Sequence, residues 1–434
     1  MSEWKKVKLG ELYEVHNGLS KGRQFFGSGY PFLTFSNVFN NWFLPEKLDS
    51  LVQSSEKERE ACSIKKGDVF ITRTSETMNE LGMSSVALRD YPNATYNGFT
   101  KRLRPIDDSV VPEYIGYYLR SPKFRGKFMA FSSMTTRASL ANGDLLNMEV
   151  ELPEKSLQVS IASILHRYDS LIENCQKQIK LLEEAAQRLY KEWFVDLRFP
   201  GHDNNKIVDG VPEGWENKKI ADVCDTIGGG TPSTKIASYY EGGTISWVTP
   251  TDITKSSSLC LLSTEKKITD DGLKHSSAKM LPKETILMTS RASVGYFGIC
   301  DFEVCTNQGF ISCVPFEKEF QMYLLHNLMN RVEEIRIKAG GSTYLEISKN
   351  VFRNLDILWP TQMIVEAFQR KAHRLLERIR IIAKQVRLLT EARDRLLPKL
   401  MSGEISVETA QSVTSELGVR KEQTGSPKPS GSKQ

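Results

Sequence analysis

Apolar residues recur at alternating three- and four-residue intervals in two long segments, residues 154–197 and 361–403. This spacing marks the a and d positions of heptads, which helices bury when they form a coiled coil. Each segment therefore predicts one helix of about 60 Å, at roughly 1.5 Å per residue. A heptad seam needs a partner, so we expect the two helices to pair within the chain. The expected seam residues are Leu165, Tyr168, Ile172, Cys175, Ile179, Leu182, Leu189, Trp193, Leu375, Ile379, Ile382, Val386, Leu389, Leu396 and Leu400.

The rest of the sequence is rich in short apolar runs that are typical of strands. Runs such as DVFITRT, TISWVTP, TILMTSR and GFISCVPF contain many Val, Ile, Thr and Phe residues and end at turn-forming residues. Two other runs, EYIGYYLRS and YLLHNLMNRVEEIRIKA, are expected to be helical insertions. The pattern predicts α+β modules and shows no sign of a βαβαβ parallel sheet.

The two halves of the chain repeat one another. LLEEAAQRLYKEWFVD (181–196) and LLTEARDRLLPKLMSGE (388–404) share six identical residues at a separation of 207 positions. Upstream, NMEVELP parallels NLDILWP, and NGF (97–99) parallels NQGF (307–310). Landmarks in the same order indicate a tandem duplication of a strand-rich module followed by a long helix. The expected parts are a first module (1–153), a first helix (154–197), a linker (198–211), a second module (212–360), a second helix (361–403) and a disordered tail (404–434).

Composition narrows the class of protein. The 434 residues are too many for one ordinary core, and no run of 18 apolar residues could span a membrane. The N-terminal sequence MSEWKKVKLG lacks the apolar stretch of a signal peptide. Seven cysteines form no CxxC pair, which argues against a zinc site and a disulfide framework. A reducing cytoplasm is the expected location.

The positive charge is mild overall but concentrated in one region. A net charge of +5 is compatible with nucleic-acid binding without demanding it. The segment 370–400 is strongly basic. It could be the solvated face of a helix, or a surface for DNA or an acidic partner, and both interpretations stay open.

Motifs for catalysis are absent apart from one decoy. FFGSG (25–29) fits the glycine loop of adenosylmethionine-dependent methyltransferases, but the chain has no accompanying NPP or DPP. We therefore interpret these glycines as turn residues. No phosphate-binding loop, nuclease cluster, HExxH or GxSxG occurs, and His166 and His373 are isolated on the predicted helices. We expect a non-catalytic protein without a metal.

The order of these parts resembles a known family. The first module, LLEEAAQRLYKEWFVD, VPEGWE, the second module and LLTEARDRLLPKLMSGE together resemble the specificity subunits of type I restriction–modification enzymes over residues 1–405. Segments similar to the family's target-recognition motifs are GGGTPSTK (228–235), TISWVTPTDI (244–253), TSRASVG (289–295), TNQGF (306–310) and GSTYLEIS (341–348). The first half departs from these motifs, with NGLSKGR, NGF and MTTRASLA in their place.

The resemblance implies a DNA reader with two heads. Two target recognition domains would lie in a pseudo-two-fold arrangement around an antiparallel coiled coil, each reading one half of a bipartite sequence in double-stranded DNA. The coiled coil would set their spacing and dock two methyltransferase subunits, and two restriction–translocation subunits would complete the enzyme. Adenosylmethionine, ATP and Mg²⁺ would bind to those partners and not to this chain.

Residues that can contact bases or phosphates are frequent in the motif segments. In the second module the candidates are Thr234, Lys235, Ser290, Arg291, Ser293, Asn307, Gln308, Ser342, Thr343 and Tyr344. In the first module they are Lys21, Arg23, Arg73, Thr74, Ser75, Asn97, Lys101, Arg102, Thr135, Thr136 and Arg137.

Several candidates have structural alternatives. Asn97 and Asn307 precede turn segments and could simply build them, and Arg73 and Arg291 could form ion pairs. Asn37 and Asp252 occupy matching positions and are interpreted as Asx-turn residues.

Two other functions compete with DNA recognition as a subunit. One is a solitary DNA methyltransferase or nuclease with unrecognised motifs, and the other is a coiled-coil adaptor for proteins. The pairing hypothesis also predicts that a fragment ending near residue 200 dimerises through its own heptads.

Overall fold

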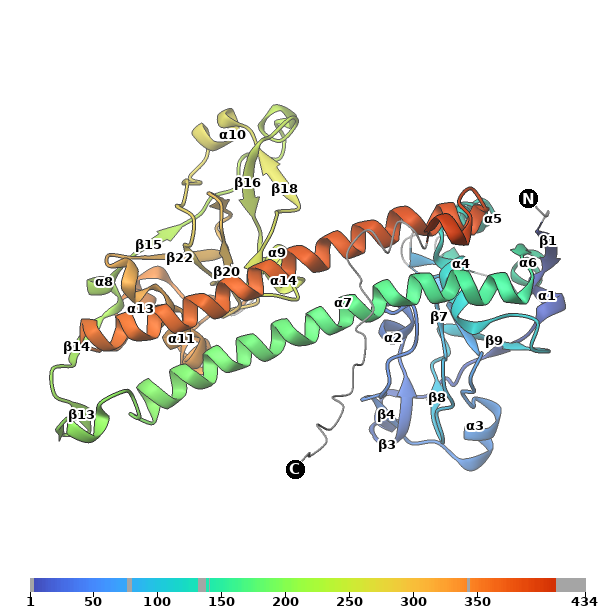
Figure 1. The fold of residues 1–434 in the computed structure, drawn as a ribbon, viewed down its shortest axis with the longest axis horizontal. Helices are drawn as coiled ribbons and strands as arrows, with labels where there is room; N and C mark the ends of the chain where they lie inside the picture. The colour runs from blue at the N-terminus through green and yellow to red at the C-terminus, as the bar shows by residue number, and fades with distance from the viewer. Residues whose placement is uncertain (1–3, 76–79, 132–137, 140, 342–343, 411–434) are drawn as a thin grey trace, which may run out of the picture. The chain divides into compact units, whose positions relative to one another are not determined.

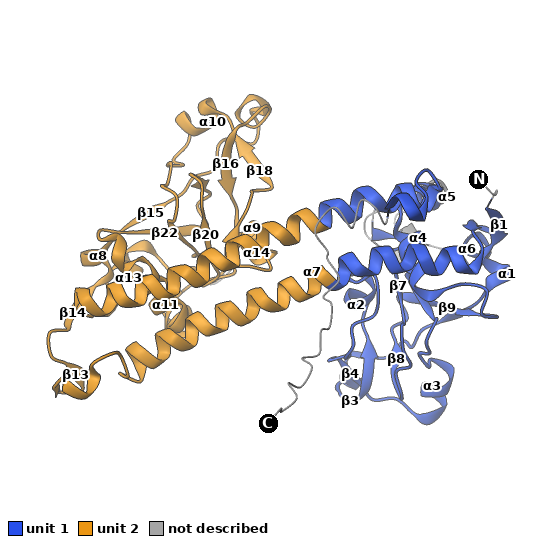
Figure 2. Cartoon of the chain, viewed as in Figure 1, with its two compact units in different colours: residues 1–170, 390–434 blue, residues 171–389 orange. Residues whose placement is uncertain are grey.

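The computed structural model describes residues 4–75, 80–131, 138–139, 141–341 and 344–410. The chain forms two compact units (Figure 2). Unit 1 contains residues 1–170 and 390–434, and unit 2 contains residues 171–389. The two predicted long helices are present as α7 (Lys155–Tyr190) and α14 (Gln362–Ser402), and each contributes residues to both units. Residues 411–434 of the expected disordered tail lie outside the described residues. For residues 404–410 the expectation is wrong, because they are folded and the apolar side chains of Val407 and Ala410 are buried.

Unit 1 is built on a four-stranded antiparallel sheet with a small second sheet beside it. The order of the first sheet is β2-β9-β5-β7, and in the second β3 pairs antiparallel with β4 and parallel with β8. The strands are β1 (Lys5–Lys8), β2 (Tyr13–Asn17), β3 (Phe26–Leu33), β4 (Leu51–Val52), β5 (Val69–Thr72), β6 (Thr74–Ser75), β7 (Ser84–Val86), β8 (Thr95–Tyr96), β9 (Thr100–Pro105), β10 (Ala138–Ser139) and β11 (Glu149–Leu152). The helices are α1 (Leu9–Leu12), α2 (Phe35–Asn40), α3 (Glu56–Ala61), α4 (Pro112–Arg120), α5 (Pro122–Phe131) and α6 (Asn142–Asn147).

Unit 2 repeats the core of this topology and adds β17 as a fifth strand at the edge of the larger sheet. The order β15-β22-β19-β20 corresponds to β2-β9-β5-β7, and β18-β16-β21 corresponds to β4-β3-β8 with the same strand directions. The strands are β12 (Ile207–Val208), β13 (Val211–Pro212), β14 (Glu216–Lys219), β15 (Cys224–Gly228), β16 (Ile245–Val248), β17 (Cys260–Leu261), β18 (Lys266–Ile268), β19 (Ile286–Thr289), β20 (Phe297–Cys300), β21 (Cys305–Thr306), β22 (Phe310–Pro315) and β23 (Asp356–Trp359). The helices are α8 (Ile220–Val223), α9 (Pro250–Thr254), α10 (Asp270–Lys274), α11 (Gln321–Asn330), α12 (Val332–Ile337) and α13 (Lys349–Arg353). The fold is α+β, and the duplication seen in the sequence is also a duplication of topology.

Matching turn residues support the equivalence of the two units. Asn37 accepts a hydrogen bond from the Thr34 backbone N–H at 3.0 Å, and Asp252 accepts one from the Thr249 N–H at 2.7 Å. Each pair forms a capping box that starts a short helix after a strand, with Asn37 and Asp252 at the third helical position. Both side chains therefore have a local structural role, but as capping-box residues and not as Asx turns. FFGSG runs from a 3₁₀ turn into β3, where Gly29 has a φ of +104° and a Cβ would meet the Val52 carbonyl. The glycines therefore allow the irregular backbone of β3.

The long helices pack antiparallel in each unit (Figure 1). In unit 2, Ile179 lies near Ala383, and Ala186 lies near Leu376. Residue numbers thus increase along α7 in the direction in which they decrease along α14, so the two helices are antiparallel. In unit 1, Asp169 of α7 contacts Arg393 of α14.

Most of the predicted seam residues are buried, and the others are half-buried. The half-buried ones are Leu182, Leu189, Leu375, Val386 and Leu389. Leu376, next to Leu375, is fully buried instead because α14 also packs against Met322 and His326 of α11. Packing on two sides gives α14 an apolar face wider than a strict a/d seam. Trp193 lies on a π-helical turn, Lys191–Val195, which follows α7.

No helix within the described ranges is both long enough and apolar enough to cross a bilayer.

Candidate functional site

Four motif segments of unit 2 converge into one group of loops, residues 228–235, 289–295, 306–310 and the described residues 340–341 and 344–347, which we call loop cluster 2. The Gly230 N–H donates to the Thr306 carbonyl at 2.9 Å, and the Ser290 N–H donates to the Gly309 carbonyl at 2.8 Å. The Ala292 N–H donates to the Leu345 carbonyl, also at 2.8 Å. Backbone hydrogen bonds therefore hold the four segments together.

The glycines of loop cluster 2 are required by close packing. A Cβ on Gly229 would lie 2.2 Å from the Asn307 carbonyl oxygen, and one on Gly230 would lie 2.3 Å from Ser277 Oγ. Asn307 closes the turn that follows, because its Oδ1 accepts the Gly309 N–H at 2.9 Å. The GGG and NQG patterns thus have a structural cause, which does not exclude contact with a ligand.

The predicted residues of loop cluster 2 differ in accessibility. Ser290 is buried and Asn307 is half-buried, whereas Arg291 is exposed with its Nε 3.6 Å from Glu346 Oε2. Ser342 and Thr343 lie outside the described residues. The exposed candidates are Thr234, Lys235, Arg291, Ser293, Gln308 and Tyr344.

Equivalent segments of unit 1 form loop cluster 1, from residues 18–23, 72–75, 97–102 and 138–139. The Gly98 N–H donates to the Leu19 carbonyl, and the Arg73 N–H donates to the Phe99 carbonyl, each at 2.9 Å. In unit 1, β6 pairs with β10, and at the equivalent position of unit 2 the backbones of Arg291 and Glu346 form an isolated β-bridge. The same cluster is therefore built twice.

Several candidates of loop cluster 1 point into the unit. Lys101 and Arg102 are 5% and 3% exposed, and Arg102 donates to the Ser63 carbonyl at 2.6 Å. Burial, and then the charge of Arg73, lower the pKa of Lys101. Asn97 is also buried, with its amide bonded to the Leu33 carbonyl and the Phe99 N–H. These residues hold the unit together, and contact with DNA through them stays a prediction.

The other candidates of the first module differ in their surroundings. Arg23 is exposed and Arg73 is half-buried. Lys21 is mostly covered and pairs with Glu58 Oε2 at 2.8 Å. The backbones of Thr74 and Ser75 form β6. Thr135, Thr136 and Arg137 lie outside the described residues.

Phe99 is an exposed residue that the sequence comparison missed. Its side chain is 66% exposed, although its N–H and carbonyl are both hydrogen-bonded within the cluster. The sequence alignment of NGF with NQGF pairs Phe99 with Phe310. However, Asn97 and Asn307 lie equally far from the prolines that end β9 and β22, so the two segments align without a gap. Phe99 therefore occupies the position of Gly309. The equal spacing to the two prolines is the signal that identifies it.

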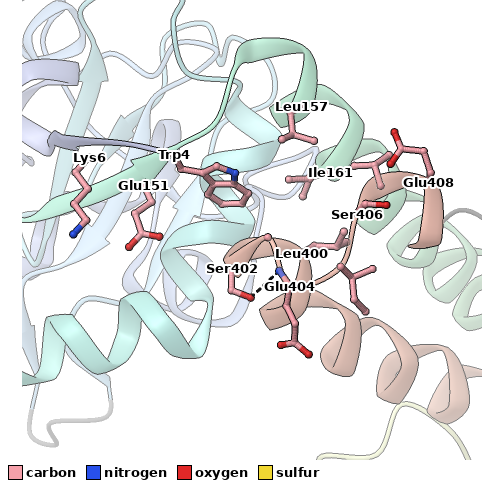
Figure 3. A pocket seen from close by; sticks show the side chains of 13 residues that line it. Trp4, Lys6, Glu151, Leu157, Ile161, Leu400, Ser402, Glu404, Ser406 and Glu408 are labelled. Atoms are coloured by element: carbon pink, nitrogen blue, oxygen red, sulfur yellow. Dashed lines mark hydrogen bonds between the residues drawn. The ribbon is translucent and has the colours of Figure 1, made fainter. Parts of the chain in front are cut away.

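Two other features of the surface do not fit a DNA contact. A pocket of unit 1 (Figure 3) is lined by apolar residues such as Trp4 and Leu400 and by the acidic residues Glu151, Glu404 and Glu408. The lining also contains Lys6, and the pocket shares no residue with loop cluster 1.

The described residues also bring Glu284, His373 and Glu377 of unit 2 within reach of a single ion. However, Arg380 already donates to both of these carboxylates. An arginine thus takes the place that a cation would need.

Comparison with known proteins gives a consistent picture. A family model described as "Type I restriction modification DNA specificity domain" matches residues 1–184 and 212–381. The specificity subunit of the type I restriction enzyme MjaIX from Methanocaldococcus jannaschii is 28% identical in sequence, and the match covers 94% of this chain and 94% of that protein. The HindI specificity subunit of Haemophilus influenzae is 24% identical over 93% of this chain and its full length. The S subunit of a type I system from M. genitalium shares the fold, with a TM-score of 0.53, 15% identity and coverage of 92% of this chain and 96% of that chain.

Proposed function

The chain belongs to the type I restriction–modification DNA specificity family, and from this premise we propose that each unit reads one half of a bipartite DNA sequence through its loop cluster. One observation carries the proposal. The same arrangement of backbone hydrogen bonds is built twice, but it presents different side chains, Arg291 and Gln308 in one unit and Arg23 and Phe99 in the other. Two equivalent scaffolds with different exposed residues suit a target whose two halves differ.

The exposed side chains have the chemistry that reading DNA requires. Arginine donates two hydrogen bonds to guanine, glutamine pairs with adenine, and apolar side chains contact the methyl group of thymine. Lysines such as Lys235 supply phosphate contacts that fix the register on the duplex. The continuous helices α7 and α14 are proposed to set the separation of the half-sites.

We also propose that this chain is non-catalytic and acts in the cytoplasm within a larger enzyme. Two methyltransferase subunits and two restriction–translocation subunits would supply the chemistry and would bind adenosylmethionine, ATP and Mg²⁺. The alternative, a solitary methyltransferase, requires that the purified chain alone methylate DNA when adenosylmethionine is added. A protein adaptor would give no mobility shift with DNA, even with methyltransferase subunits present.

The decisive experiment maps methylated bases in the genome of cells that express this chain and its methyltransferase partner. The proposal requires one methylated motif with two dissimilar half-sites and a fixed gap. Exchanging residues 1–153 for the first module of another family member should change one half-site only. A change in both halves would contradict the assignment of one half-site to each unit.

Replacing Arg291 by alanine is expected to weaken specific binding by about 1–3 kcal/mol if Arg291 reads a base. Its ion pair with Glu346 is long and solvent-exposed, so little stability should be lost. Binding of the partner-loaded chain would be measured on target and random duplexes at several salt concentrations. An equal loss on both duplexes would make Arg291 a phosphate contact. Arg378→Ala, an exposed change on α14, is the control.

Leu181 and Leu388 are candidates for docking the methyltransferase subunits. They occupy equivalent positions of the repeat and are 64% and 60% exposed. Ile381 is similarly exposed at 55%, but its counterpart in the repeat is Asn174, so it serves as a matched control. Burying a leucine contributes about 1.5–3 kcal/mol, so glutamate at either position should weaken docking of one subunit by tenfold or more.

The stoichiometry of the complex distinguishes the outcomes. Leu181→Glu or Leu388→Glu should each leave one methyltransferase subunit bound in light-scattering measurements, and the double variant should leave none. Ile381→Glu should leave two. A double variant that still binds two subunits would place the docking surface elsewhere.

A further inference from the structure

Unit 1 contains a charged contact between the two long helices. Arg393 Nη1 of α14 lies 2.6 Å from Asp169 Oδ1 of α7, and the Tyr117 hydroxyl donates to the other oxygen of this carboxylate. The Arg393 guanidinium also lies over the ring of Trp42, 5.2 Å from its centroid. The side chains of Arg393 and Asp169 are only 13% and 18% exposed. We call these four residues the Asp169–Arg393 node.

The node is electrostatically balanced. Burial opposes the positive charge of Arg393, but the hydrogen bond and charge of Asp169 outweigh this effect and raise the arginine pKa. Arg393 also donates to Asp394 Oδ1 from Nε at 3.0 Å and from Nη2 at 2.8 Å, and Asp169 is the less exposed of these two carboxylate partners. Removal of Arg393 would leave Asp169 largely buried without this partner.

Unit 2 has no such charges at the equivalent positions. The repeat distance of 207 residues relates Asp169 to Leu376, and it relates Ala186 to Arg393. Leu376 and Ala186 are both buried and line the same small hollow between the helices. The contact between α7 and α14 that is an ion pair in unit 1 is thus replaced by two apolar residues at the equivalent positions of unit 2.

This difference decides which helices can pair. Suppose that α7 paired with α7 of a second copy in the same geometry. Asp169 of each copy would then face Ala186 of the other copy and would lose its contact with Arg393. If α14 paired with a second α14, each Arg393 would face Leu376. The pair of two α7 helices would bury two Asp169 carboxylates without their arginines, and the pair of two α14 helices would leave each Arg393 with Asp394 but without Asp169. The pair of α7 with α14 leaves neither side chain without its partner.

We propose that the Asp169–Arg393 node is a pairing key, which makes the seam of α7 accept α14 and reject a second copy of α7. A single polar position in an apolar seam is known to select the partner at some cost in stability. The key would keep one reader of each kind in every molecule, so that symmetric readers with two identical heads do not form. This inference revises the expectation that a fragment ending near residue 200 dimerises efficiently.

The test uses the full-length chain cut after folding. A protease site is placed in the exposed segment 206–210, and the folded protein is cut there while its helices remain paired. Two preparations of the cut protein, which carry different tags, are then mixed. Pull-down of one tagged N-terminal half then reports whether it captures a second N-terminal half. For the natural sequence we expect capture of C-terminal halves only.

The informative variant transplants the residues of the other repeat, Asp169→Leu with Arg393→Ala. All pairings are then apolar at this level, so capture of N-terminal halves by one another should rise by roughly tenfold or more, because the penalty for an unpaired buried charge is gone. Arg393→Lys, which keeps the charge, should behave like the natural chain. A folded double variant without increased exchange would overturn the proposal.

A second variant guards against misfolding of the first. Asp169→Asn keeps the size of the side chain and removes its charge, so α7 should again pair with itself more often. Unchanged exchange in a folded Asp169→Asn protein would also overturn the proposal. No DNA is present in these measurements, so their outcome does not depend on the proposed reading of half-sites.

Discussion

Replacing Arg380 by alanine is expected to lower the free energy of unfolding by about 3–5 kcal/mol, the effect of breaking a buried ion pair. The Arg380 side chain is 8% exposed and lies 2.5 Å from Glu284 and 3.8 Å from Asp301, and it also contacts Glu377. Burial opposes its charge, but Glu284 and the other neighbouring acidic groups outweigh this effect and raise the pKa of Arg380. Without the arginine, Glu284 and Glu377 would lose this cation beside a cavity, and Asp301 would keep its ion pair with Lys384 at 2.8 Å.

The size of this loss should depend on pH. Burial alone would raise the pKa of Asp301, but Lys384 and Arg380 outweigh it and hold the pKa below the ordinary value. A carboxylate with a lowered pKa stabilises the fold above its ordinary pKa, and this contribution disappears as the pH falls through the folded-state pKa. The variant loses one of the two cations that lower the pKa of Asp301, and with it part of this contribution. The difference in stability between the natural chain and Arg380→Ala should therefore shrink between pH 7 and pH 4.

Denaturant unfolding at the two pH values measures both effects. Arg378→Ala is the control, because Arg378 is exposed on the same helix and should change stability by less than about 0.5 kcal/mol. A loss in Arg380→Ala that is equal at both pH values would assign the effect to packing. A loss no larger than that of the control would contradict the structural role of Arg380.

The sequence predicts the repeated elements well because their patterns are local. Heptad spacing identifies α7 and α14, and Val-, Ile- and Phe-rich runs identify strands such as β5, β19 and β22. The capping boxes that contain Asn37 and Asp252 are also local, since each side chain bonds to a backbone N–H three residues away. Such features depend on neighbours in the chain and can be recognised without the fold.

The accessibility of the candidate residues could not be predicted in the same way. Lys101 and Arg102 are adjacent in β9, where alternation would expose one of the two, but both faces of this strand are covered. The partners of Arg102 and Arg380 lie about 40 and 100 residues away in sequence, at Ser63 and Glu284. These contacts follow from tertiary packing, for which TKRLRP and RIRIIAK contain no local signal. Conversely, the exposure of Phe99 follows from a turn that buries Asn97 beside it.

Insertion of one heptad into each long helix is expected to lengthen the gap between the two half-sites by about three base pairs. Seven helical residues add about 10.5 Å, and each base pair of B-DNA occupies about 3.4 Å. The insertions belong after Lys177 and after Lys384, which are equivalent in the repeat and lie near the contact of Ile179 with Ala383. Leucines at the seam positions, with glutamate and lysine elsewhere, keep the 3.5-residue period of the pair.

Mapping of methylated bases in cells that contain the variant and its partners gives the readout. Both half-sites should be unchanged in sequence and the gap longer, because the loop clusters are untouched. Three base pairs also rotate the duplex by roughly 100°, at 10–10.5 base pairs per turn, so methylation of the new target should be less efficient than that of the original. An insertion into α7 alone shifts the seam against α14, separates Asp169 from Arg393, and should abolish methylation of either target. If the doubly extended chain instead methylates the original target with its original gap, the helices do not set the spacing and another contact must hold the half-sites apart.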